Sequence, residues 1–179
     1  MSAESDWRVR VTISDLPPQG KEYELVPDAE VRKELAERAA VVAIPKLIAK
    51  LKVLPQSKAG AVVEGSLQAT VTQTCIVTLE PFDNYIDETI SLVFEPEEAI
   101  AARGPLTEEI AGEDPPEPIV DGAIDLATVV AEFLTLSIDP YPRKPGAAFE
   151  ALAGGDDADT PSPFAALAKL KPGQGDKKQ

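Results

Sequence analysis

The stretch VVEGSLQATVTQTCIVTLEPF, residues 62–82, decides the fold of this chain. Its odd-numbered positions are mostly apolar, and its even-numbered positions mostly carry hydroxyl or charged groups. This period of two predicts an antiparallel strand with one buried face. The strand is expected to run from Val62 to Glu80. Because that is longer than most strands, we expect a bend or a bulge, at Gly65 or Gln73.

Segments on both sides of this stretch predict its partners. Lys46–Leu54 and Tyr85–Phe94 alternate in the same way, and short turns join them to the central strand. The three segments therefore predict a β-meander. Earlier strands are expected over Trp7–Ile13 and Lys21–Leu25.

Two helices are expected around the meander. Asp28 is a suitable N-cap for a helix that runs to about Ala40. Asp125 is a suitable N-cap for a second helix, whose broad apolar face ends before Asp139 and Pro140. That second helix is expected to pack on the inner face of the sheet. The predicted fold class is α+β, with an antiparallel sheet that is either open or curled into a partly open barrel.

The domain organisation follows from the later composition. Residues 1–150 are expected to form one domain, with an acidic, proline-bearing and flexible excursion at about 96–120. Residues 151–179 are expected to form a flexible tail. No apolar run approaches the roughly 18 residues that a membrane span needs, and the N-terminus does not resemble a signal peptide. The sequence thus predicts a cytoplasmic protein that does not bind membranes.

The charge distribution is strongly asymmetric. The net charge is −14, and residues 80–160 hold twenty acidic side chains against three basic ones. Such a charge disfavours non-specific binding to nucleic acid. The chain has one cysteine and no histidine. It therefore lacks the common zinc ligands and the commonest general base, and we expect no catalytic, metal or cofactor site.

The central block Gly65–Pro81 resembles the YceD family, also called the large ribosomal RNA subunit accumulation protein. The resemblance continues at Phe94-Glu-Pro96, at Ile124-Asp-Leu126 and at Asp139-Pro-Tyr-Pro-Arg-Lys-Pro-Gly146. The residues that carry it most clearly are Gly65, Cys75, Pro81, Asp125, Leu126, Pro140 and Pro142. Many members of the family have a second cysteine three residues after the first. This chain has Thr78 there, which puts any metal role of such a pair in doubt.

The resemblance implies a non-enzymatic factor that supports accumulation of large-subunit ribosomal RNA and ribosome assembly. Its expected partner is a precursor of that RNA or a basic ribosomal protein, and no small-molecule substrate is expected. Two alternatives stay open, an RNA-processing enzyme of nuclease type and a structural adaptor unrelated to ribosomes.

Four groups of residues are candidate functional sites. Lys46, Lys50 and Lys52 project to one side of a strand, where they either contact phosphates or form a solvated face or a protected sheet edge. Arg143 and Lys144 either bind a phosphate or pair with acidic residues. The acidic run within residues 80–160 either binds a basic partner or is only a solvated segment. Cys75 is either a reactive thiol or a small buried side chain.

Overall fold

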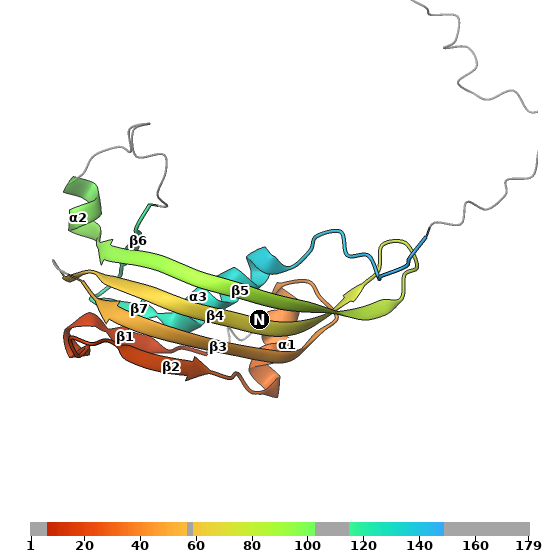
Figure 1. Cartoon of the computed structure of the whole chain (residues 1–179), viewed down its shortest axis with the longest axis horizontal. Helices are drawn as coiled ribbons and strands as arrows, with labels where there is room; N and C mark the ends of the chain where they lie inside the picture. Colours follow the sequence, from red (N-terminus) through yellow and green to blue (C-terminus); the bar gives the residue numbers. More distant parts are fainter. Residues whose placement is uncertain (1–6, 57–58, 103–114, 149–179) are drawn as a thin grey trace, which may run out of the picture. The chain divides into compact units, whose positions relative to one another are not determined.

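Three long antiparallel strands form the centre of a five-stranded sheet in the computed structural model, which describes residues 7–56, 59–102 and 115–148. They are β3 (Ala43–Pro55), β4 (Ala61–Thr74) and β5 (Pro81–Pro96). A short strand, β2 (Lys21–Leu25), flanks β3, and β6 (Glu117–Ile119) runs parallel to the last residues of β5. The strand order is therefore β2-β3-β4-β5-β6 (Figure 1).

The remaining elements are short. A two-stranded sheet pairs β1 (Arg10–Thr12) with β7 (Ala123–Asp125), and the 3-10 helix η1 (Ile13–Asp15) follows β1. The helices are α1 (Ala29–Arg38), α2 (Glu97–Ala102) and α3 (Leu126–Ser137). The chain divides into two units, Met1–Ala147 and Ala148–Gln179, and all of these elements belong to the first.

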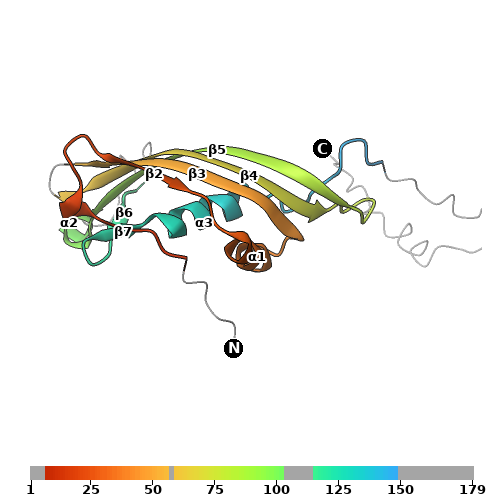
Figure 2. The ribbon, with the colours of Figure 1, turned by 90° about the horizontal axis from the view of Figure 1, so that it is seen from below.

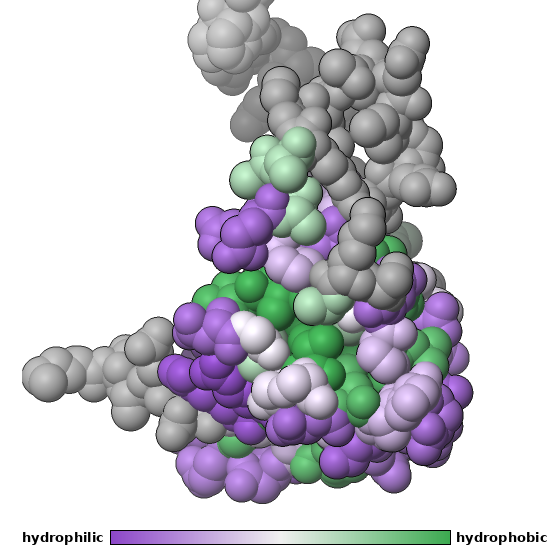
Figure 3. Space-filling view, turned by 90° about the vertical axis from the view of Figure 1, so that its left-hand side faces the viewer, coloured by the Kyte–Doolittle hydropathy of each residue, from purple (hydrophilic) through white to green (hydrophobic). Residues whose placement is uncertain are grey.

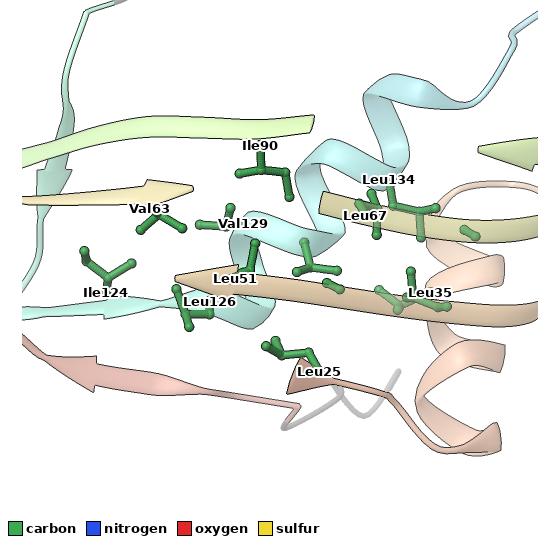
Figure 4. Close-up of a cluster of buried hydrophobic side chains, with 14 of the residues drawn as sticks. Leu25, Leu35, Leu51, Val63, Leu67, Ile90, Ile124, Leu126, Val129 and Leu134 are labelled. Carbon is green, nitrogen blue, oxygen red and sulfur yellow. The ribbon is translucent and has the colours of Figure 1, made fainter. Parts of the chain in front are cut away.

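Described elements cover one face of the sheet, and none of them covers the other face, which is called the open face below (Figure 2). The helices α1 and α3 lie on the same side of the sheet, together with β7 (Figure 2). Between them and the sheet lies the core, in which side chains of the strands and of α3 point toward one another (Figure 4). Leu67, Ile90 and Leu126 are each fully buried there. Burial of one such side chain stabilises the fold by about 1.5–3 kcal/mol.

Asp125 fixes the start of α3 and attaches it to the N-terminal segment. Its carboxylate accepts a hydrogen bond from the backbone N–H of Ala127 at 3.1 Å, as an N-cap does. The same oxygen accepts from the N–H of Val9 at 3.0 Å. One side chain therefore connects the residue before β1 to the end of β7 and the start of α3.

Gly65 lets β3 and β4 approach each other in the middle of the sheet. It lies opposite Leu51 on β3 and opposite Ile90 on β5. A Cβ atom at this position would overlap the backbone oxygen of Lys50 and lie 2.9 Å from the Cα of Leu51. Glycine in a strand interior often marks such a close approach of two backbones.

The predicted meander, the N-caps Asp28 and Asp125, and the α+β class are confirmed. The sheet does not close into a barrel. The central strand was predicted too long, because β4 ends at Thr74 and residues 75–80 form a turn. β4 pairs with β5 without a bulge, and the irregularity lies on β3 between Ala43 and Lys46.

The sequence missed the two three-residue strands β6 and β7. Within the excursion predicted at 96–120, the structure describes α2 and β6. Residues 103–114 lie outside the described residues, as does the predicted tail at 151–179.

We expect Gly65→Ala to lower the free energy of unfolding by about 1–3 kcal/mol, because the added methyl group forces β3 away from β4. Urea denaturation measures the change. Ser66→Ala is the matched control, since Ser66 is the adjacent residue on the same strand and faces the open side. Equal stability of the two variants would contradict the role given to Gly65.

Candidate functional site

The three candidate lysines lie in one row on the open face of the sheet. They alternate along β3 with the buried side chains of Leu47, Leu51 and Val53 on the other face. The predicted common direction of the lysines is therefore confirmed. β2 pairs with β3 only at residues 49–53, so Lys50 and Lys52 do not lie on a sheet edge. The interpretation as protection of a sheet edge is wrong for these two lysines and stays a prediction for Lys46, which lies outside this pairing.

Acidic side chains on the neighbouring strands face the same lysines. Lys50 lies opposite Glu24 of β2, and Lys52 lies between Glu22 of β2 and Glu64 of β4. Lys46 lies opposite Thr70 instead. Carboxylates directly across from ammonium groups offset their charge, so the row is a mixed surface rather than an isolated basic stripe.

Cys75 lies at the tip of the β4–β5 hairpin, directly after β4. The turn closes when the Cys75 N–H donates to the carbonyl of Glu80 and the Leu79 N–H donates to the carbonyl of Cys75, each at 2.9 Å. Leu79 has a positive φ of 59°, a strained conformation for a leucine. The Ile76 N–H donates to the carbonyl of Pro142 at 2.9 Å. The segment after α3 is thereby attached to the turn.

The Cys75 sulfur accepts several hydrogen bonds within this turn. The backbone N–H groups of Val77, Thr78 and Lys144 lie 3.4, 3.5 and 3.4 Å from Sγ. The side chain is inaccessible to solvent. The pKa of the thiol falls from 9.0 to about 6. The hydrogen bond from the Thr78 hydroxyl is the main cause, burial opposes it, and the three backbone donors add to it.

Thr78 stands where the resemblance places a second cysteine. Its hydroxyl donates to the thiolate, and its oxygen accepts from the Glu80 N–H at 3.4 Å. The residues described contain no group of three or more His, Cys, Asp or Glu side chains that would hold a metal ion. The hydrogen-bond donors of the turn stabilise the anionic form of the sulfur.

The two basic residues after α3 differ in their surroundings. The Lys144 ammonium forms an ion pair with the Glu80 carboxylate at 2.9 Å, and its backbone N–H reaches Cys75. Both ends of the pair are about half exposed, at 47% and 61%, so the pair contributes about 0–1 kcal/mol to stability. Arg143 is exposed. The phosphate contact predicted for these two residues stays a prediction.

The strand β5 is the acidic part of the described sheet. From Glu80 to Ala102 the chain has seven acidic residues and no basic one. Asp83, Asp87 and Glu88 are exposed on β5, and Tyr85, between the first two, is 79% exposed. Sequence reasoning placed Tyr85 on the outer face but did not single it out. The signal available in the sequence was the alternation of side chains along this strand, in which Ile86 faces the core and Tyr85 therefore faces outward.

Other surface features are less specific. A groove of about 650 Å³ runs between α1 and α3, with Trp7, Arg38 and Leu136 in its lining. Apolar patches lie between polar ones at the end of the molecule that carries α2 and β6 (Figure 3).

Among the described helices, none has the length and apolar character that crossing a membrane requires.

The Cys75 pKa has a consequence for stability. Because the folded-state pKa is lowered, the thiolate contributes stability that is fully present above pH 9.0 and is lost as the pH falls through about 6. We expect the free energy of unfolding of the native chain, relative to Cys75→Ser, to rise between these two pH values. Urea denaturation at stepped pH measures this difference.

Two substitutions test the cause of the lowered pKa. The ultraviolet absorbance of the thiolate gives its titration midpoint directly. Thr78→Val is expected to raise the midpoint, whereas Thr74→Val, at the exposed end of β4, is expected to leave it unchanged. A native midpoint near 9.0, or equal midpoints in the two variants, would contradict the assigned hydrogen bond.

Comparison with known proteins gives one match. The model of the family described as large ribosomal RNA subunit accumulation protein YceD matches residues 63–171. No curated protein and no solved structure matches the chain. The matched region begins in β4 and includes the Cys75 turn, β5 and α3, while β1–β3 and α1 precede it. Since the match spans more than half of the chain, this protein belongs to the YceD family.

Proposed function

We propose that this protein is a non-enzymatic, cytoplasmic factor that supports accumulation of large-subunit ribosomal RNA by binding a basic ribosomal protein. The name of its family supports the role in RNA accumulation. The observation that carries the choice of partner is the acidic strand β5 with its flanks, where seven carboxylates occur without a basic residue between Glu80 and Ala102. A surface of one charge sign attracts partners of the other sign and accelerates their association.

Direct contact with precursor RNA through Lys46, Lys50 and Lys52 is the second candidate. Their place in one row on the open face favours it, because side chains at every second position reach successive phosphates. The carboxylates of Glu22, Glu24 and Glu64 count against it. Glu24 faces Lys50, and the other two flank Lys52. The protein partner is therefore preferred.

Affinity capture, with both RNA and proteins identified, tests the two binding modes. We expect the full chain to retain a basic ribosomal protein after ribonuclease treatment. Charge reversal of the three lysines to glutamate is expected to leave this capture unchanged. Capture that is lost on ribonuclease treatment and on lysine reversal would favour RNA contact instead. If neither ribosomal RNA nor a ribosomal protein were enriched, the proposed function would be wrong.

Two assays address the other function classes. In a strain without this protein, sucrose gradients are expected to show a loss of large ribosomal subunits, and a normal profile would favour an adaptor unrelated to ribosomes. The pure protein is expected to leave precursor RNA intact in the presence of divalent metal ions. Reproducible cleavage at defined positions would favour a nuclease.

A further inference from the structure

The strand β5 has a long edge that no other described strand pairs with. On one side it pairs with β4 from Pro81 to Phe94. On the other side β6 pairs only with Phe94, Glu95 and Pro96. Figure 1 shows β5 as the outer long strand of the sheet, with β6 beside one end only. The edge from Pro81 to Val93 therefore presents backbone N–H and C=O groups in the manner that permits addition of a strand.

The side chains along this edge form a defined pattern. Asp83, Tyr85 and Asp87 occupy three successive positions on the open face, about 7 Å apart as in any strand. Asp83 is held by the Thr72 hydroxyl, which donates to its carboxylate at 2.7 Å. Glu88 projects to the other face but is exposed. This row therefore has two carboxylates with an aromatic ring between them. A Lys or Arg side chain interacts favourably with each of these groups.

The same charges disfavour pairing of β5 with a second copy of this chain. Such pairing would bring the acidic residues of two β5 strands close together, and like charges across a strand pair are destabilising. An inward-facing charge such as Glu88 also discourages edge-to-edge association. A basic strand meets no such repulsion. The edge thus discriminates between partners by charge while the backbone provides the binding.

We propose that the β5 edge from Pro81 to Val93 binds an extended, Lys/Arg-rich segment of the partner as an additional strand. The inference rests on the proposed function, because it assigns the binding mode of the basic ribosomal protein. Basic side chains of the added strand contact Asp83, Tyr85 and Asp87 on the open face. On the opposite face, one basic side chain contacts Glu88, and apolar ones lie beside Ile86 and Ile90.

A labelled synthetic peptide of alternating lysine and valine is the probe for the full chain. A version N-methylated at every amide has the same charge and no N–H donor on either edge, so it cannot form the backbone ladder. We expect the N-methylated peptide to bind at least about tenfold more weakly, since several hydrogen bonds are lost. Equal binding of the two peptides would show that charge attraction alone accounts for the interaction, and strand addition would then be wrong.

Matched variants locate the binding edge. Asp87→Asn with Glu88→Gln removes two charges from β5, and Glu22→Gln with Glu24→Gln removes two from the short opposite edge, β2. Only the β5 variant is expected to weaken peptide binding, by about tenfold. Hydrogen exchange is expected to slow at amides of residues 82–93 when the peptide is bound. Unchanged exchange there, or equal weakening in both variants, would place the site elsewhere.

The result is separable from that of the proposed function. If the affinity capture still retains a ribosomal protein while the peptide fails to bind the edge, the function stands and the binding mode is wrong. If ribosomal protein capture fails as well, the proposed partner is wrong. Dimers of the free chain held by β5, detected by sedimentation, would show that the edge is already occupied and would also overturn the inference.

Discussion

The fold depends on burial of one face of the sheet by the helices α3 and α1 (Figure 2). Three long strands present aliphatic side chains to one side, and α3 contributes Leu126, Val130 and Leu134 to the same core. Removal of this apolar area from water is the main term that stabilises such a layered fold. Since the other face has no cover among the described elements, it has to be polar, and it carries hydroxyl and charged groups. The surfaces left for partners are therefore this open face, the sheet edges and the hairpin tip.

The sequence predicted the elements whose pattern is long and periodic. Alternation identified β3, β4 and β5, and the capping residues Asp28 and Asp125 located the two larger helices. It overestimated β4 because the apolar alternation continues through Cys75 and Val77 into the turn. What ends the strand is the positive φ of Leu79 and the hydrogen bonds that close the turn. Strands of three residues, such as β6 and β7, are too short to show a period.

The candidate site was predicted less completely, because its partners come from register and tertiary contact. The direction of Lys46, Lys50 and Lys52 follows from alternation alone. That two of them face acids on β2 and β4 follows only from the pairing of the strands. Likewise, the N–H of Lys144 reaches Cys75 across 69 positions of sequence. Several residues that carried the family resemblance prove to be structural: Gly65 permits close strand packing, Asp125 caps α3, and Pro142 holds the hairpin turn.

The connection of Asp125 to Val9 has a consequence for the order of folding. The two residues are 116 positions apart, whereas β2 to β5 pair with their neighbours along the chain. Contacts of high sequence separation form late, because the intervening chain has to be ordered first. During synthesis the residues of the meander emerge before residues 126–137, and in that interval its apolar face lacks the cover of α3. Such an exposed face is prone to aggregation until α3 arrives.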